Sequence, residues 1–393
     1  MELTTVPTAA ELAQRASDLV PLLRRNAAWG EQNRRIADES VEALTGAGLL
    51  RLRAPSRFGG YEADLRSLVD VITQVGRGDG STAWTLSVWS ICSWLVGLFP
   101  DEVQDEVFAT PDVRVCGLLS PGGPAIPVDG GYVVSGKWAF NTAVQQSHWN
   151  SLVAVTPTPD GGMMPVMALV PASELQIIDD WDTTGLRGTG SVTAAAAELF
   201  VPAQRVLPMG PVLHEQYASK TNADVPVYRT PMLLTAATST TGTVLGLAKA
   251  AREAFFERLP GRKITYTTYE SQADAPITHL QVAEASVRID EAEFHIYRAA
   301  STLDAKGVSG EAWTMEERAR VRVDISRAVQ LAKEAVDILK TASGASSAYH
   351  DVPIQRIARD LEVLSLHAIL HPANGLELYG RVACGLEPNT LYI

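Results

Sequence analysis

Cysteine is scarce in this chain of 393 residues. The three cysteines, Cys92, Cys116 and Cys384, are odd in number and far apart in the sequence. Such spacing supplies neither a disulfide framework nor the paired thiolates of a zinc site. We therefore predict that the protein has no metal centre and resides in the reducing cytoplasm.

Basic residues are also few. Lysine and arginine number 33 against 45 aspartates and glutamates, which gives a net charge of -12 and a pI near 5.1. The sequence has no cluster of positive charge that could neutralise phosphates, so a nucleic-acid partner is not expected. Residues 1–10 lack the basic start and the apolar core of a secretory signal, which also favours the cytoplasm.

Charge is missing altogether from residues 80–100. The run is long enough to cross a bilayer, but it contains several serines and threonines, and no second run of this kind occurs. We interpret it as a buried core helix and expect no association with a membrane.

The periodicity of the apolar residues divides the chain into three regions. In residues 1–112 they recur at three- and four-residue spacing, as in Leu19, Leu22 and Leu23, which indicates helices. In residues 113–213 short apolar runs are separated by glycine, proline and aspartate, which predicts an antiparallel β-sandwich or barrel.

Residues 214–393 form the third region, which is again helical in pattern. Its long apolar-periodic segments are 233–259, 277–305, 311–341 and 354–384. Four such segments predict a four-helix bundle. The expected fold is therefore α+β, with an N-terminal helical domain, a middle antiparallel β domain and a C-terminal bundle.

Local motifs occur in all three regions. They are Ala-Pro-Ser-Arg-Phe-Gly-Gly-Tyr at 54–61, Gly-Asp-Gly-Ser-Thr-Ala-Trp at 78–84, Gly-Lys-Trp-Ala-Phe-Asn-Thr-Ala at 136–143, Gly-Leu-Arg-Gly-Thr-Gly-Ser at 185–191 and Asp-Val-Pro-Ile-Gln-Arg-Ile-Ala-Arg-Asp at 351–360. On these motifs the chain resembles the acyl-CoA dehydrogenase superfamily, whose fold has the same order of domains. Residues 78–84 and 136–143 resemble its oxygenase branch, the two-component (group D) flavin-dependent monooxygenases.

A missing glutamate supports the oxygenase branch. Dehydrogenases of this superfamily commonly carry a catalytic glutamate about two helical turns after the position of Asp360. Residues 361–370 contain only Glu362, which is too early, and the expected place is held by His367 and Ala368. The resemblance thus implies the dehydrogenase scaffold without the dehydrogenase base.

The resemblance also implies cofactors and partners. Oxygenases of this kind use O2 and reduced FAD, with FMN as an alternative, and form a flavin C4a-hydroperoxide that transfers oxygen to the substrate. Because no nicotinamide-binding fingerprint is present, a separate NAD(P)H-dependent flavin reductase is expected to supply the reduced flavin. The family's usual assembly is a homotetramer in which neighbouring subunits complete each flavin site.

Site residues are carried over from the matching motifs. Thr142 is expected near flavin N5, through its side chain or its backbone, and His367 is the candidate acid-base or orienting residue, since an unperturbed histidine titrates near neutral pH. Arg262 is expected at the flavin pyrophosphate, where a guanidinium fork suits phosphate oxygens. The full set of expected cofactor contacts is Trp138, Asn141, Thr142, Thr189, Ser191, Arg262, Thr265, Gln281 and Gly344.

The substrate is expected to be flat and aromatic. All seven histidines lie at or after position 148, so the first region offers no histidine to hold a phenolate. Tryptophans in residues 80–100 instead favour an apolar ring such as an indole, a carbazole or a polyketide of secondary metabolism. The expected substrate contacts are Trp89, Trp94, His148, His367 and His371.

Three other functions stay open on the sequence alone. One is N-hydroxylation of an amine or amino sugar, which would need carboxylates and basic groups in the pocket. The second is an acyl-CoA dehydrogenase with its base elsewhere, and the third is a catalytically silent flavin-binding scaffold.

Overall fold

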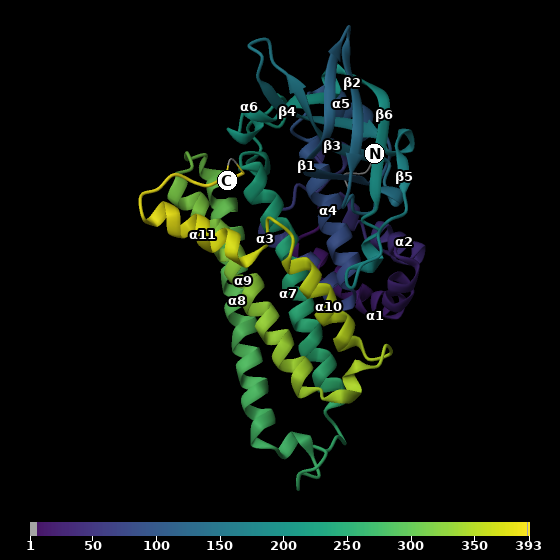
Figure 1. Cartoon of the computed structure of the whole chain (residues 1–393), viewed down its shortest axis with the longest axis vertical. Helices are drawn as coiled ribbons and strands as arrows, with labels where there is room; N and C mark the ends of the chain where they lie inside the picture. Colours follow the sequence, from purple (N-terminus) through teal and green to yellow (C-terminus); the bar gives the residue numbers. More distant parts are fainter. Residues whose placement is uncertain (1–5, 391) are drawn as a thin grey trace.

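The computed structural model describes residues 6–390 and 392–393. A helical N-terminal part and a β-sheet lie at one end of a long helical bundle (Figure 1). The N-terminal helices are α1 (Ala9–Asn33), α2 (Asp38–Gly46), α3 (Leu65–Gly78), α4 (Gly80–Val96) and α5 (Asp101–Val107). Every residue of α4 is buried, which confirms the core helix predicted from its lack of charge.

The middle part of the chain forms a seven-stranded sheet with the order β5-β6-β2-β1-β3-β4-β7. The strands are β1 (Val115–Val128), β2 (Gly131–Trp138), β3 (Trp149–Pro157), β4 (Met163–Pro171), β5 (Gln176–Ile178), β6 (Thr193–Pro202) and β7 (Val206–Pro208). The short helix α6 (Met209–Leu213) follows the last strand.

The sheet is mixed, which corrects the purely antiparallel sheet that we expected. Strand β1 pairs with β2 in antiparallel fashion and with β3 in parallel fashion. The chain leaves β2 and crosses to the other side of β1 before it starts β3, and this crossover gives β3 the direction of β1. Sequence alternation reports which face a residue takes but not the direction of the neighbouring strand. The crossover itself carries residues of the candidate site.

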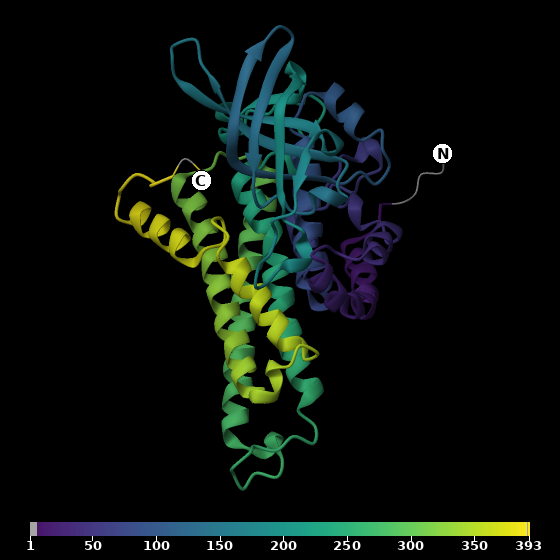
Figure 2. The same ribbon diagram turned by 45° about the vertical axis from the view of Figure 1, so that its right-hand side comes forward.

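The bundle consists of α7 (Met232–Arg258), α8 (Pro276–Ser309), α9 (Met315–Ala342) and α10 (Pro353–Ser365). The fourth predicted segment, 354–384, is in fact two helices, because α10 ends at Ser365 and α11 (Pro372–Ala383) starts afresh. Proline disfavours a helical conformation in the preceding residue, and His371 is accordingly extended, with φ -56° and ψ 122°. Figure 2 shows α11 turned away from the bundle axis.

The N-terminal part joins the bundle through a close crossing of α3 and α7. A side chain built on Gly246 would come within 2.6 Å of the Thr73 carbonyl oxygen and 2.7 Å of the Gly76 Cα. Only glycine allows the two backbones to approach this closely. The crossing fixes α4, which follows α3 directly, against the bundle and the sheet.

Replacing Gly246 by alanine is expected to destabilise the protein by about 1–3 kcal/mol, because the added methyl group must push α3 away from α7. Urea unfolding of the variant and the wild type measures the difference. Gly380→Ala is the control, since Gly380 lies in α11 and its added methyl group would meet no atom within 4 Å. Equal losses of stability in the two variants would contradict the packing argument.

Candidate active site

Two segments bring three hydroxyl groups together next to α4. Thr142 lies on the β2–β3 crossover, while Thr189 and Ser191 lie on the turn that precedes β6. Two backbone hydrogen bonds tie these segments to each other, since the Asn141 N–H donates to the Val192 carbonyl (3.1 Å) and the Ala143 N–H to the Thr189 carbonyl (2.9 Å). The three hydroxyls are buried.

The hydroxyls form a hydrogen-bonded chain with one direction. One direction satisfies every contact of the chain: Thr189 donates its hydroxyl hydrogen to the Leu186 carbonyl (2.8 Å), which also accepts from the Trp181 indole N–H (3.1 Å), and its oxygen accepts from Ser191 (2.7 Å). Ser191 has then used its hydrogen and accepts from Thr142 (2.9 Å). Thr142 in turn accepts from the indole N–H of Trp84 on α4 (3.1 Å). The direction of the chain therefore runs from Trp84 to Leu186.

This direction limits what Thr142 can offer a ligand. A hydroxyl has one hydrogen and two lone pairs. The hydrogen of Thr142 is used toward Ser191 and one lone pair by Trp84, so one lone pair remains. The free group is thus an acceptor, suited to a ligand N–H. Reduced flavin carries a hydrogen on N5, whereas oxidised flavin does not.

His367 follows the C-terminal end of α10 and packs against Trp84. The centroids of the two rings are 5.2 Å apart. Burial, and then the positive charge of Arg322, lowers the pKa of His367 to about 4. Its Nδ1 accepts a long hydrogen bond from the Ile369 N–H (3.4 Å), which leaves the proton of the neutral ring on Nε2. At neutral pH the side chain is therefore a hydrogen-bond donor rather than a cation.

A cavity of about 370 Å³ begins beside His367. His367 itself is exposed although protein surrounds it on most sides, and the two residues that follow it in the chain, Ala368 and Ile369, line the cavity. The lining comes from β1, α7, α9, the α10–α11 connection, α11 and the C-terminal segment. Its residues are Leu119, Ser120, Leu233, Arg322, Ala368, Ile369, Asn374, Glu377, Leu378, Asn389, Thr390 and Tyr392.

Helix α10 holds the turn that carries Thr189 and Ser191. The buried carboxylate of Asp360 accepts from the Leu186 N–H (2.6 Å). A side chain on Gly185 would lie 2.1 Å from the Arg359 carbonyl oxygen, so this position must be glycine for α10 to dock. The turn is thus fixed from both sides of Leu186.

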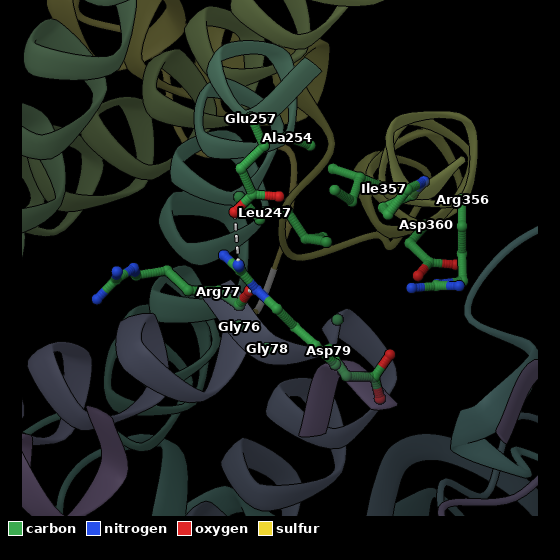
Figure 3. A pocket seen from close by; sticks show the side chains of 14 residues that line it. Gly76, Arg77, Gly78, Asp79, Leu247, Ala254, Glu257, Arg356, Ile357 and Asp360 are labelled. Atoms are coloured by element: carbon green, nitrogen blue, oxygen red, sulfur yellow. Dashed lines mark hydrogen bonds and ion pairs between the residues drawn. The ribbon is translucent and has the colours of Figure 1, made fainter. Parts of the chain in front are cut away.

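Burial, followed by the negative charge of Asp79, raises the pKa of Asp360 to about 7. Arg356 lowers the pKa of this carboxyl and Glu31 raises it, but both effects are smaller. Figure 3 shows Asp79, Arg356 and Asp360 around a small cavity of about 70 Å³ at the base of α4. Asp79 caps α4 by accepting from the Thr82 N–H (2.8 Å). The two buried carboxyl groups thus hold the N-terminal end of α4 and the turn at Leu186.

Asp360→Asn is expected to change how stability depends on pH. An unfolded aspartate has a pKa near 3.9, so between about pH 4 and pH 7 the folded protein holds a proton that the unfolded chain has released. The stability of the wild type should therefore fall as the pH rises, by up to about 1.4 kcal/mol per unit from this group. Asparagine does not titrate, so the stability of the Asp360→Asn variant should not fall with pH through this position.

The effect is measured by urea unfolding of both proteins at pH 5, 6 and 7. The free energy of unfolding of the variant minus that of the wild type should rise with pH. Asp337→Asn is the matched control, since Asp337 is exposed and pairs only with Lys340 on its own helix (3.0 Å). A difference for Asp360→Asn that stays constant with pH would contradict the elevated pKa.

A second group of predicted residues meets at the other end of the bundle. Arg262 follows α7 and donates to the Ser343 carbonyl, beside Gly344, which has φ +65°. Arg258 donates to Ser346 Oγ (3.1 Å). Neither arginine forms an ion pair within the described part of the chain. Burial, and then the charge of Arg258, lowers the pKa of Arg262. Two uncompensated cations beside a glycine turn suit a phosphate.

Four predicted cofactor contacts stand apart from these two groups. Trp138 is 1% exposed and donates to the Val153 carbonyl (2.7 Å), and Asn141 is fully enclosed, so neither side chain is accessible to a cofactor. Thr265 is exposed after α7, and Gln281 is half-buried on α8.

Two of the predicted substrate tryptophans lie in the core. Trp89 is 1% exposed and donates to Ser147 Oγ (2.9 Å), and Trp94 is fully enclosed and donates to the Val227 carbonyl (2.6 Å). Neither lines the cavity. Because their indole N–H groups are used inside the protein, both serve to pack α4.

His148 and His371, two further residues predicted to contact the substrate, do not line the cavity either. His148 accepts from the Arg114 backbone N–H (3.0 Å), and burial, then the charge of Arg114, lowers its pKa. His371 directly precedes α11, so the break between α10 and α11 separates it from α10. Its Nδ1 is buried without a hydrogen-bond partner in the part of the chain that the structure describes.

The sequence reasoning missed three residues that the structure brings to these sites. Trp84 lies in the motif at 78–84, and its position at the end of that motif was the available signal. Arg258 precedes Arg262 by four residues, which is one helical turn. Arg322 lies in the middle of a helical pattern with other charges around it, and nothing in the sequence marks it as buried.

Neither a metal cluster nor a membrane-spanning helix is found in residues 6–390 and 392–393. Within these residues no three or more histidine, cysteine, aspartate or glutamate side chains gather in a way that could hold a metal ion. None of the described helices combines the length and the apolar character needed to cross a membrane.

Comparison with known proteins decides the family. Residues 10–111 match the N-terminal domain family of the acyl-CoA dehydrogenases, and residues 239–372 match their C-terminal domain family. The chain is 32% identical over 375 residues to the flavin-dependent monooxygenase oxygenase subunit HsaA of Rhodococcus jostii (strain RHA1), covering 95% of this chain and 98% of that protein. The chain belongs to the two-component flavin-dependent monooxygenases of the acyl-CoA dehydrogenase superfamily.

Further relatives of this monooxygenase agree. It is 30% identical over 392 residues to the oxygenase component of an FADH(2)-dependent resorcinol hydroxylase from Rhizobium sp. (strain MTP-10005), covering 97% of this chain and 96% of that one. The solved structure of XiaF from a Streptomyces species, in complex with FADH2 and glycerol, is 32% identical, with a TM-score of 0.91 over 97% of each chain. The family and the fold implied by the sequence motifs are therefore confirmed. As an oxygenase component, the protein uses reduced flavin that a separate reductase supplies.

Proposed function

We propose that this monooxygenase hydroxylates an aromatic or heteroaromatic ring with reduced FAD and O2. When bound, the flavin would supply the oxygen chemistry, through the C4a-hydroperoxide that the family resemblance implies. The observation that carries the proposal is the acceptor left free on Thr142, which is hydrogen-bonded to Trp84, the ring that packs against His367. Relatives named for resorcinol and indole-3-acetate support the ring class of the substrate.

The loop that carries Thr142 also offers a surface for a flat ring system. Phe140 has φ 63° and is 72% exposed, and its ring meets Trp181 edge to face, with centroids 5.9 Å apart. An exposed aromatic ring held in place beside a free acceptor fits an isoalloxazine. In this arrangement Thr142 would hold the flavin N5–H.

The neutral state of His367 favours orientation of the substrate over removal of its proton. A pKa of about 4 makes the ring a weak base at neutral pH, whereas its Nε2–H can donate to an oxygen or ring nitrogen of the substrate. The apolar lining residues Leu119, Leu233 and Leu378 would keep water from the reacting atoms.

FAD fits the group formed by Arg258, Arg262 and the turn at Gly344 better than FMN does. Arg258 and Arg262 could bind the diphosphate and adenosine half of FAD, which FMN lacks. Figure 1 shows the α7–α8 connection, which contains Arg262, at the end of the bundle farthest from the sheet. Leu233 near the start of α7 lines the cavity, and Arg258 ends the same helix about 38 Å away at a rise of 1.5 Å per residue. The ring and diphosphate sites of one chain are therefore too far apart to share one cofactor, so a second copy would complete each site.

The surface of α8 supports an oligomer. Leu280, Val287 and Phe294 are exposed and follow one another at seven-residue spacing, so they form one apolar row along the helix. Apolar rows of this kind mark protein–protein contacts. We propose that copies of this chain cover the row in a homotetramer, as is usual in the family.

Thr142→Val is expected to raise the hydrogen peroxide released per molecule of product by about tenfold or more, because the variant loses the acceptor that holds the flavin. Peroxide and product are assayed together, with reduced FAD supplied and an aromatic substrate present. Thr142→Ser keeps the hydroxyl and should stay close to the wild type. Unchanged peroxide release in the valine variant would overturn the role of Thr142.

Arg262→Gln is expected to weaken FAD binding by about tenfold to a hundredfold while leaving FMN binding unchanged, because FMN lacks the diphosphate. Calorimetry with both flavins under anaerobic conditions measures this difference. Sedimentation should show a tetramer, and mixing Arg262→Gln with Thr142→Val subunits should restore some intact sites. Equal losses for FAD and FMN, or a monomeric protein, would contradict the shared site.

A further inference from the structure

Arg322 on α9 is a buried cation without a counter-ion. Its side chain is 5% exposed, and no ion pair includes it in the described part of the chain. Nη1 donates to the Ile369 carbonyl (2.6 Å), while Nε is buried and has no acceptor. Burial lowers the pKa of Arg322 to about 10, so the guanidinium remains charged at neutral pH. A buried charge with one hydrogen bond is costly unless a ligand completes it.

The nearest acidic residue along α9 cannot serve as this partner. Asp324 already binds the guanidinium of Arg298 and His295 Nδ1 (2.9 Å). A second deeply buried arginine, Arg53, has a different environment, since it lies 6.0 Å from the centroid of the Trp94 ring and lines neither cavity. Arg322, by contrast, lines the 370 Å³ cavity beside His367.

From this placement we propose that Arg322 binds a carboxylate on the substrate and thereby selects aromatic acids over neutral aromatic compounds. The inference rests on the proposed function, since it assigns the substrate class of the same cavity. The guanidinium suits a carboxylate because its planar donors match the two oxygens. The apolar residues Leu119, Leu233 and Leu378 line the same cavity and leave room for the ring. His367 lies close enough to Arg322 for that charge to lower its pKa, and it would hold the ring's polar edge.

Glu377 is the other charged residue in the lining, and it makes the proposal testable against an amine substrate. It is exposed on α11, whereas Arg322 is buried, so Arg322 has the greater need for a ligand charge. An amine would depend on Glu377, while a carboxylate depends on Arg322. Variants at these two positions therefore separate the two classes.

The experiment measures binding rather than turnover. Protein loaded with reduced FAD is titrated anaerobically in a calorimeter with matched acid and amide pairs, namely phenylacetate with phenylacetamide and indole-3-acetate with indole-3-acetamide. We expect the wild type to bind at least one acid about tenfold or more tightly than its amide. Arg322→Gln keeps a donor for the Ile369 carbonyl but loses the charge, and it should abolish this preference.

Controls separate charge recognition from structural damage. Arg320 lies on the same helix, is exposed and, within the described residues, hydrogen-bonds only to Tyr379 Oη (2.6 Å), so Arg320→Met should keep the preference for acids. Arg322→Lys keeps the charge and should retain part of the preference, which tests the idea if Arg322→Gln does not fold. Equal losses for acid and amide in Arg322→Gln would show a structural role and overturn the proposal.

The remaining outcomes are also decisive. If the wild type prefers none of the acids, or if only Glu377→Gln alters binding, Arg322 is not the carboxylate site. If the preference depends on Arg322 but no ring is hydroxylated with reduced FAD and oxygen, the site stands and the proposed function fails. If neutral rings are hydroxylated and Arg322→Gln has no effect, the function stands and this inference fails.

Discussion

The hydrogen-bonded chain from Trp84 to the Leu186 carbonyl is the interaction on which the candidate site depends. It joins α4, the β2–β3 crossover and the turn before β6, which come from parts of the chain that are far apart in sequence. Asp360 of α10 holds the N–H of the same Leu186, so the bundle fixes the end of the chain. A shift of α10 or α4 would therefore change the acceptor that Thr142 offers to a ligand.

The charge that a ligand would meet in the cavity depends on which charged residue is buried in its lining, not on the net charge of the protein. The protein as a whole is acidic, yet the deepest charge in the cavity lining is the cation Arg322. This charge helps to keep His367 neutral, so the two side chains offer an anion site and a neutral donor next to each other. Recognition by a few polar groups in an apolar cavity is the usual design of a small-molecule site.

Much of the fold could be predicted from the sequence because it depends on local pattern. The uncharged run at 80–100 predicted the buried helix α4, and apolar periodicity predicted the long helices α7, α8 and α9. The parallel pairing of β1 with β3 could not be predicted, since alternation does not encode strand direction. Pro372 signals the break between α10 and α11, but the apolar pattern continues across it and predicted one helix over 354–384.

The candidate site was predictable only where a motif carried it. Thr142, Ser191 and Arg262 came from motifs, and the structure brings Thr142 against Ser191 and Arg262 against the turn at Gly344. The sequence does not show which tryptophan of α4 belongs to the site and which only packs the core. Each indole N–H of Trp84, Trp89 and Trp94 donates to a residue that is distant in sequence. Arg322 was invisible for the same reason, since the burial of a helix position is set by α11 and the cavity beside it.

The most direct test of the account follows the flavin absorbance after protein loaded anaerobically with reduced FAD is mixed with oxygenated buffer. The account predicts that the spectrum of oxidised flavin returns only after a lag that free reduced FAD does not show, because the site holds the N5–H and excludes water. Immediate return of the oxidised spectrum, as fast as for free flavin, would contradict it.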